Sequence, residues 1–551
     1  MRVNGSKWRL LTAGVAVASA MALAGNDFQV DGAQLPKGIE LVELGAYATG
    51  YFDQGGAEIA AYDAASKRLF VVNLRDRSVD LVDISNPGAP FLAHKIDVSP
   101  WGSQANSVSV RDGVAAIAIE APVKTSPGTV AFFTGWGQFL SAVPVGALPD
   151  MLTHTPNGQM VLVANEGEPS GYGPGFIDPP GSVSIIDLRG GVESLTAADV
   201  TAVGFEAFNA EPLDPRIRIF GPGATVAQDL EPEYIAVSHD SQTAWVTLQE
   251  NNALGIIDLK SRRVTRLVGL GFKNHNLFGA GLDPSDRDTQ SINISPRRVW
   301  GMYQPDAIDT YEYRGRTYLV TANEGDVREW PNVGGPGVNN EAARVSTLSL
   351  DATAFPDGAA LKANASLGRL QVTTRLGNID GDSDFDRLYS FGARSFSIWD
   401  DRGELVYDSG DAFERTTSQR LPDWFNANHT NNVNLGNPND WTRDSRSDDK
   451  GPEPEGVTIA RVFGRQYAFI ALERIGGVMV YELGDPQTPR FVDYVNVRTF
   501  GVDGASAAAK DLGPEGIIVI KEEDSPSGRP LLVTANEVSG TTRVFEIRPK
   551  K

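Results

Sequence analysis

The chain has 551 residues, 41% of them hydrophobic, with 58 glycines, 33 prolines and no cysteine. This length exceeds one ordinary core, so several domains or a repeat array are expected, and the many turn-forming residues argue against a mainly helical protein. The net charge of −21 argues against a nucleic-acid partner and suits metal cations or cationic partners. The lack of cysteine excludes disulfides, thiolate nucleophiles and zinc-thiolate sites.

Residues 1–24 have the pattern of a secretory signal peptide. Arg2, Lys7 and Arg9 precede an apolar run that ends in the small residues of a cleavage site. A short linker, residues 25–36, follows. No later segment is apolar over the length of a membrane span. We therefore expect an exported protein, periplasmic or extracellular, with no integral membrane segment in its mature chain.

Four strand-like runs separated by turns recur along the chain, which is the pattern of a propeller blade. The clearest unit has its strands at 234–238, 244–248, 253–259 and 264–270. The same order occurs at 56–98, 104–145, 148–188 and beyond, and 453–497. The sequence therefore predicts an all-β fold.

The unit between 303 and 408 is stretched by a long insertion, and its last two strands come only from Ser395 onward. Counting this stretch as one blade gives a seven-bladed β-propeller, and counting it as two gives eight. No Pro-Asp/Glu segment opens before Ser395, which favours seven.

The last unit, from Gly513 to Ile547, supplies only three strands, whereas the extended run from Ile39 to Tyr47 has no unit of its own. Pairing of these N- and C-terminal strands would close the ring and remove an exposed edge. We expect a single propeller domain over 37–548, with long insertions at 327–376 and 409–450.

Acidic residues mark two fixed positions in these units. Each unit opens on a short segment, most often Pro-Asp/Glu-hydrophobic, and the next strand ends on a carboxylate or an amide. The opening column is Glu58, Asn106, Asp150, Glu233, Asp306, Glu455 and Glu515, and the closing column is Asn73, Glu120, Glu166, Glu250, Glu324, Glu473 and Glu537. A hairpin returns to the level at which it began, so both columns should crowd one mouth of the central channel.

Like charges at such spacing raise one another's pKa unless a cation lies among them. We therefore predict one or more divalent cations at this mouth, with calcium as the first candidate and a second divalent metal as a further one. The candidate ligands are Glu166, Glu233, Glu324, Asp306, Glu455, Glu515 and Glu537. The alternative is that these side chains cap turns or pair with nearby bases such as Arg474.

A second acidic cluster, residues 378–386, alternates oxygen donors in a way that suits a loop wrapped around calcium. Its candidate ligands are Asp380, Asp382, Asp384 and Asp386. The spacing is not that of an EF-hand, because glycine occupies the fourth position and Tyr389 the twelfth. The alternative is a solvated acidic turn.

Basic residues in the insertions are candidates for binding an anionic substrate. Arg446 and Lys450 lie directly before the strand that opens near Glu455, where they could hold an anion beside a metal, and Arg344 has a similar place in the first insertion. The alternative is that these bases only neutralise the acidic ring. Motifs for a serine nucleophile, a phosphate loop, a dinucleotide or a zinc protease are absent, and the five histidines have no ligand spacing.

Four motifs, at 164–168, 321–326, 394–399 and 445–457, resemble the choice-of-anchor I proteins of bacteria. That family is similar to the mesenchyme-specific cell-surface glycoproteins of animals, which are associated with biomineralisation, and some members have been called atypical alkaline phosphatases. The resemblance implies a secreted propeller associated with calcium and leaves the activity open.

Two functions are compatible with this sequence. In the first, metal ions at the mouth activate water to hydrolyse a small-molecule phosphoester, with Arg446 or Arg344 holding the phosphate. In the second, calcium is structural and the disc is a non-catalytic platform or scaffold for an extracellular polymer, such as polysaccharide, or for mineral or a protein.

Overall fold

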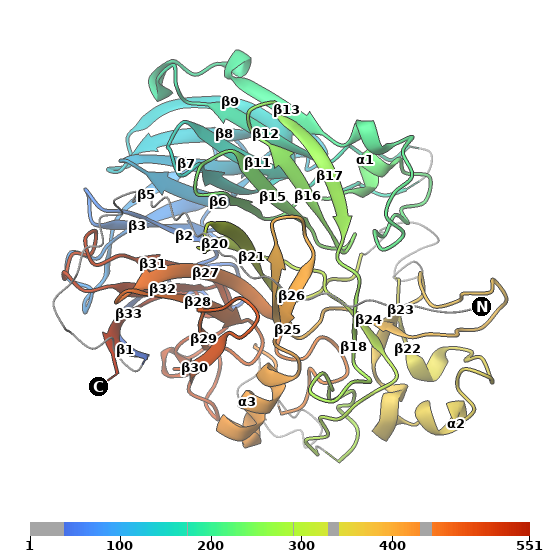
Figure 1. The fold of residues 1–551 in the computed structure, drawn as a ribbon. Coiled ribbons are helices and arrows are strands. Elements are labelled where there is room, and N and C mark those ends of the chain that lie inside the picture. The colour runs from blue at the N-terminus through green and yellow to red at the C-terminus, as the bar shows by residue number, and fades with distance from the viewer. Residues whose placement is uncertain (1–37, 173–174, 290, 329–340, 430–442, 551) are drawn as a thin grey trace, which may run out of the picture.

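The computed structural model describes residues 38–172, 175–289, 291–328, 341–429 and 443–550. The expected signal peptide and the whole linker lie outside these ranges, as do parts of both insertions. The described chain is all-β and propeller-like, with seven four-stranded antiparallel sheets (Figure 1). Within it, no helix has the length and apolar character needed to cross a membrane.

The sheets follow one another along the chain, and in six of them the strand order is the sequence order. The first two contain β2 (Ala60–Asp63), β3 (Arg68–Asn73), β4 (Ser78–Asp83) and β5 (Phe91–Asp97), then β6 (Gln104–Arg111), β7 (Val114–Glu120), β8 (Pro127–Thr134) and β9 (Phe139–Ala147). The third and fourth contain β10 (Pro149–His154), β11 (Met160–Asn165), β12 (Ser182–Asp187) and β13 (Val200–Gly204), then β14 (Ile235–Val237), β15 (Thr243–Leu248), β16 (Ala253–Asp258) and β17 (Arg263–Gly269).

The fifth and sixth contain β20 (Ile308–Tyr313), β21 (Arg316–Asn323), β25 (Ser395–Asp400) and β26 (Leu405–Asp408), then β27 (Pro454–Val462), β28 (Arg465–Leu472), β29 (Val478–Glu482) and β30 (Arg490–Val495). The seventh combines β31 (Pro514–Ile520), β32 (Leu531–Asn536) and β33 (Thr541–Pro549) with β1 (Ile39–Ala48). In that sheet β1 pairs antiparallel with β33, from Ile39 opposite Pro549 to Ala48 opposite Thr541.

The first strands of the sheets touch one another in sequence order. Strands β2, β6, β10, β14, β20, β27 and β31 each contact the next, and β31 also contacts β2. These contacts bring the first strands of the seven sheets next to one another, and the sequence puts the opening column of carboxylates at the start of these strands.

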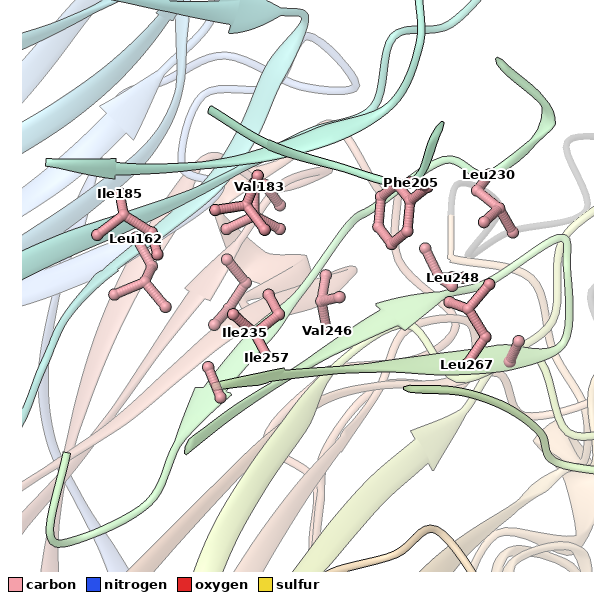
Figure 2. Packing of buried hydrophobic residues seen from close by; sticks show 14 of the residues in the cluster. Leu162, Val183, Ile185, Phe205, Leu230, Ile235, Val246, Leu248, Ile257 and Leu267 are labelled. Carbon is pink, nitrogen blue, oxygen red and sulfur yellow. The ribbon is translucent and has the colours of Figure 1, made fainter. Parts of the chain in front are cut away.

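Hydrophobic side chains fill the space between neighbouring sheets. Strands such as β3 are buried on both faces because each sheet is covered on both sides. Their sequences are therefore continuous apolar runs. Figure 2 shows the interface in which Leu162 and Ile185 of the third sheet pack with Val246 and Ile257 of the fourth. Clusters of this kind join each sheet to both of its neighbours. Each fully buried side chain of this size contributes about 2 kcal/mol.

The long insertion between β21 and β25 packs as a small unit beside the sheets. It contributes β22 (Ala342–Arg344), β23 (Gln371–Thr373), β24 (Tyr389–Ser390) and α2 (Gly358–Leu361), and β24 pairs with β19 (Trp300–Met302), which in turn pairs with β18 (Phe272–Asn274). Its own apolar core includes Val345, Leu370 and Val372.

The remaining helical segments connect the sheets. Helix α1 (Val226–Asp229) precedes β14, and α3 (Ala412–Arg420) follows β26. Single helical turns occur at Val192–Ser194, Ala197–Asp199, Glu206–Phe208, Val345–Thr347, Asn364–Gly368, Pro422–Trp424 and Ala507–Ala509.

Candidate functional site

Three carboxylates of the opening column lie at irregular points of their strands. The pairing register shifts beside Asp150 in β10, beside Glu455 in β27 and beside Glu515 in β31. Such a bulge bends the strand and changes the direction of its side chains. The repeated Pro-Asp/Glu segment therefore corresponds to a repeated local distortion at one end of the first strands.

Glycine follows two of these glutamates because neighbouring first strands touch there. A Cβ on Gly456 would lie 2.1 Å from the main-chain oxygen of Glu515, and a Cβ on Gly516 would lie 2.4 Å from that of Glu58. The amide of Gly516 donates a hydrogen bond to the same Glu58 oxygen, at 3.1 Å. The Pro-Glu-Gly sequences thus bring Glu455, Glu515 and Glu58, from three successive sheets, close together.

Potential ligand atoms converge in three groups among the described residues. In each group, one atom from every residue lies within 4.8 Å of the others. The groups are Glu58, Glu515 and Glu537; His429, Glu473 and Glu537; and Glu324, Glu453 and Glu473. Because Glu537 and Glu473 are shared, the three groups form one row at the mouth.

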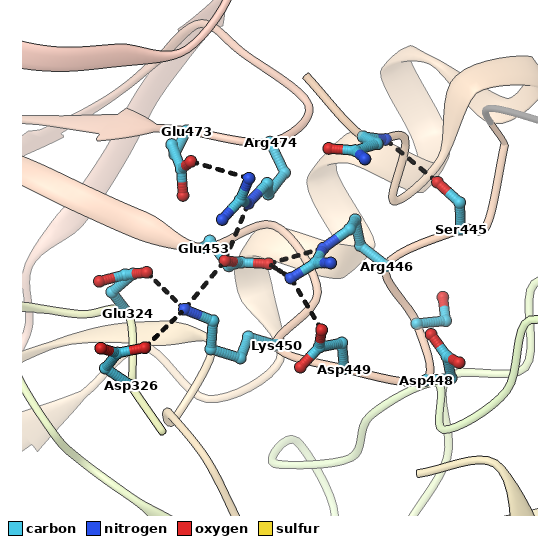
Figure 3. Close-up of polar contacts among 12 residues, drawn as sticks. Glu324, Asp326, Ser445, Arg446, Asp448, Asp449, Lys450, Glu453, Glu473 and Arg474 are labelled. Carbon is cyan, nitrogen blue, oxygen red and sulfur yellow. Dashed lines mark hydrogen bonds and ion pairs between the residues drawn. The ribbon is translucent and has the colours of Figure 1, made fainter. Parts of the chain in front are cut away.

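Basic side chains neutralise one end of this row. Glu453 is fully buried and accepts hydrogen bonds from Arg446 at 2.8 Å and Arg474 at 2.9 Å, and its carboxylate lies 3.1 Å from Lys450 Nζ (Figure 3). Burial alone would raise the pKa of Glu453, but the charges of these three bases hold it below its ordinary value.

Each of the three bases also contacts a second carboxylate. Lys450 Nζ lies 2.6 Å from Glu324, Arg474 lies 3.0 Å from Glu473, and Arg446 lies 3.0 Å from Asp449. The group of Glu324, Glu453 and Glu473 is therefore held by the protein's own cations.

At the other end of the row, Glu58, Glu515 and Glu537 form no ion pair with a lysine or arginine of the described chain. Burial, the charge of Glu58 and a hydrogen bond shared with it raise the pKa of Glu515 well above its ordinary value. Burial and the charge of Glu473 raise the pKa of Glu537 to about 9. Burial and the same charge raise the pKa of Glu455 well above its ordinary value. Glu455 and Glu515 each keep a buried Oε2 atom with no hydrogen-bond partner in the described part of the chain.

Seven carboxylates of the two columns belong to none of these groups among the described residues: Glu120, Asp150, Glu166, Glu233, Glu250, Asp306 and Glu455. Burial raises the pKa of Asp150 to about 7, against the opposing charge of Lys124. The pKa values of Glu166, Glu233 and Asp306 are likewise raised well above normal by burial and by neighbouring carboxylates. Of the predicted ligands, the structure brings Glu324, Glu515 and Glu537 into close groups, whereas Glu166, Glu233, Asp306 and Glu455 belong to no such group among the described residues.

The acidic loop at 378–386 turns several of its oxygens toward its own main chain. Asp386 accepts a hydrogen bond from the Ile379 amide at 2.7 Å, and Asp382 accepts one from the Asp384 amide at 2.8 Å. Asp380 accepts one from the Asp382 amide at 3.3 Å. None of these residues belongs to a close group of potential ligands among the described residues. Calcium binding by this loop stays a prediction.

Arg344, the remaining substrate-binding candidate, contacts the inner end of the second insertion. Its guanidinium lies 2.7 Å from the Asp448 carboxylate and donates hydrogen bonds to the main-chain oxygens of Asp448 and Arg369. All three predicted anion-binding residues, Arg344, Arg446 and Lys450, thus pair with carboxylates of the chain itself.

Sequence reasoning missed two residues of the mouth. Glu453 lies two positions before Glu455 of the opening column. Only the neighbouring residues Gly451, Pro452 and Pro454 indicate in the sequence a turn beside Glu453. His429 has no local signal, because its neighbours come from other sheets. Its Nδ1 atom lies 2.9 Å from Glu473 and 3.7 Å from Glu537, and Arg474 contacts its ring.

Fold and site together define an all-β, propeller-like protein whose first strands converge on a mouth rich in carboxylates. The chain belongs to the choice-of-anchor I domain family, whose sequence profile matches residues 58–486. This membership confirms the resemblance carried by the motifs around the mouth.

Two curated relatives are similar to parts of the chain. Gigasin-3a of Magallana gigas is 32% identical over 192 residues, which are 34% of this chain and 66% of the relative. A mesenchyme-specific cell surface glycoprotein of Strongylocentrotus purpuratus is 27% identical over 321 residues, which are 52% of this chain and 40% of the relative. The alignments therefore span less than two thirds of the length of either relative.

Solved structures that resemble the chain do so over most of its length at low sequence identity. Kuenenia stuttgartiensis hydrazine synthase matches with a TM-score of 0.44 and 13% identity, covering 91% of this chain and 99% of the other. A streptogramin B lyase structure matches with a TM-score of 0.43 and 9% identity, covering 94% and 100%.

Proposed function

We propose that this protein is a secreted, seven-bladed propeller, closed by the pairing of β1 with β33, that binds calcium at the acidic mouth of its channel. The observation that carries the proposal is the buried, unpartnered Oε2 atom of Glu515, which lies beside Glu58 and Glu537, two carboxylates that form no ion pair with a lysine or arginine of the described chain. Export fits the expected signal peptide and a family whose relatives include a protein named as a cell surface glycoprotein.

The donor set fits calcium. Glu58, Glu515 and Glu537 offer only carboxylate oxygens, which are the ligands that calcium prefers. A bound cation would supply the positive charge that lets these carboxylates ionise together. Beside them, the group of His429, Glu473 and Glu537 includes an imidazole nitrogen and suits a second divalent metal of the zinc or manganese type.

The ion pairs of the basic residues fit a non-catalytic binding platform better than a phosphate-binding enzyme. Binding of a substrate phosphate needs a guanidinium or ammonium group that is free to meet it. Arg446 and Lys450 are instead engaged by Glu453, and Arg344 by Asp448. We therefore propose that the disc presents calcium-stabilised loops to an extracellular partner such as a polysaccharide, mineral or protein.

Metal-dependent phosphoester hydrolysis is the second candidate. It is favoured by one observation, the position of His429 and Arg474 beside Glu473 and Glu537. An imidazole there could move a proton, and a guanidinium could stabilise a developing negative charge if it exchanged its carboxylate partners for the phosphate.

Calcium titration and a turnover assay on the same preparation test both candidates. Chelator-treated protein should bind calcium in isothermal titration calorimetry, Glu515→Gln should weaken that binding at least tenfold, and the exposed control Glu193→Gln should leave it unchanged. On a chromogenic phosphomonoester at alkaline pH, we expect no turnover with or without calcium. Calcium-dependent turnover that Glu515→Gln abolishes would establish the hydrolase instead, and unchanged binding by this variant would reject the site.

A further inference from the structure

A second acidic feature on the same face is a cavity of about 330 Å³ near the ends of three second strands. Glu168 follows β11, Glu250 follows β15 and Asp326 follows β21, and all three line the cavity together with Glu231 and Arg328. The cavity therefore lies among the third, fourth and fifth sheets. The proposed calcium group belongs to the seventh and first sheets, so the two sites draw on different residues.

The charges that line the cavity do not balance. Four carboxylates face one guanidinium, and that guanidinium is already engaged. Arg328 lies 2.9 Å from Glu231 and 2.8 Å from Asp229, which is fully buried, and it stacks over the ring of Phe220 at 4.8 Å. Outside the lining, Lys124 lies 4.0 Å from Glu168 and Lys450 lies 3.9 Å from Asp326, but Glu250 forms no ion pair among the described residues.

Two cavity carboxylates keep oxygens without a partner. Glu231 is only 5% exposed, and its Oε1 atom has no hydrogen-bond partner among the described residues. The Oε2 atom of Glu250 is also buried and unpartnered there. A buried acceptor left without a donor costs about 1–3 kcal/mol, so a ligand that brought N–H donors would recover this energy. Burial raises the pKa of both side chains, although Arg328 opposes that rise.

The spacing of these carboxylates does not suit a metal ion. Calcium ligands lie about 2.3–2.6 Å from the ion, so their oxygens must lie within about 5 Å of one another. Glu168, Glu231, Glu250 and Asp326 form no group of three within 4.8 Å in the described chain, whereas the mouth does. A cation that spans several ångströms and carries several N–H donors meets such separated acceptors better.

We propose that this cavity binds a small organic cation with guanidinium or primary ammonium groups, held by Glu231 and Glu250 and assisted by Glu168 and Asp326. The volume accommodates a molecule of several heavy atoms, and the aromatic ring of Tyr172, which is 7% exposed, forms part of the wall. Aromatic rings attract such cations, and carboxylates accept their N–H groups in short charge-assisted bonds.

Agmatine, which carries a guanidinium group at one end and an ammonium group at the other, is the probe that tests this proposal. Titrated into the full chain by calorimetry at low salt, it should bind with a dissociation constant below about 1 mM, and binding should weaken as salt rises. Methylguanidinium and cadaverine, titrated separately, identify which group the cavity prefers. Calcium should not displace agmatine.

Two cavity variants and two controls make the test specific. Glu250→Gln keeps the shape of the side chain and should weaken agmatine binding at least tenfold, and Glu168→Gln, at an exposed position, should weaken it several-fold without disturbing the fold. Glu193→Gln and the mouth variant Glu515→Gln should leave it unchanged. Absence of binding at 10 mM agmatine, equal binding by the wild type and Glu250→Gln, or loss of binding in Glu515→Gln would each overturn the proposal.

Discussion

Removal of the Glu453 carboxylate is the perturbation whose cost the structure defines best. In Glu453→Gln, three bases lose a fully buried partner that now lies 2.8 Å from Arg446, 2.9 Å from Arg474 and 3.1 Å from Lys450. Three contacts between a base and this carboxylate, each valued as a hydrogen bond to a charged group, would sum to about 5–9 kcal/mol. Each base keeps a second carboxylate, however, so we expect a loss of about 3–5 kcal/mol, as for a broken buried ion pair.

The loss in the free energy of unfolding is measured by urea or thermal unfolding of the wild type and Glu453→Gln at neutral pH. With an entropy of unfolding of about 2.1 cal/mol/K per residue, a loss of 4 kcal/mol lowers the Tm of a chain of 551 residues by about 3 to 4 °C. The matched control is Asp357→Asn, which removes the partner of Arg298 from an exposed ion pair and should cost at most about 1 kcal/mol. A Glu453→Gln cost no larger than that of the control would refute the view that this carboxylate organises the bases.

Three further outcomes follow from the carboxylates. Because the folded-state pKa values of Glu537 (about 9) and Asp150 (about 7) are raised, the folded protein binds more protons than the unfolded chain above pH 4, so without calcium its stability should fall as pH rises toward 9; a flat pH profile would contradict this. Calcium should raise the Tm more at pH 8 than at pH 5, because it binds the ionised carboxylates, and an equal rise at both pH values would argue against binding at the mouth. In the double variant Asp380→Asn, Asp382→Asn, calorimetry should lose one class of calcium site if the acidic loop binds calcium, while the mouth site remains; identical titrations would remove the loop from the candidates.

Most of the fold could be predicted because its signals are local and repeated. The second strand expected at 244–248 is Thr243–Leu248, and the last two strands of the stretched unit, expected from Ser395 onward, are Ser395–Asp400 and Leu405–Asp408. Period-two patterns and turn residues act over a few positions, so each unit can be recognised by itself. The convergence of Glu515 and Glu537 could also be predicted, since it follows from the return of one hairpin.

The ion-pair partners of the charged residues at the mouth and in the cavity could not be predicted, because many of these pairs join residues that are distant in sequence. Arg328 pairs with Asp229 across 99 positions, and Lys450 with Glu324 across 126. His429 reaches Glu473 from an insertion, without a regular strand to fix its direction. The folded chain therefore decides which carboxylates pair with a base and which do not, and the sequence alone does not.

The most direct test of the account is to locate the cation. Crystals of the chelator-treated protein, soaked in calcium or in its luminescent substitute terbium, should give an anomalous difference peak about 2.3–2.6 Å from the carboxylates of Glu58, Glu515 and Glu537. The soak should give no peak there in crystals of Glu515→Gln. A fully soaked wild-type crystal with no peak at the mouth would contradict the central claim.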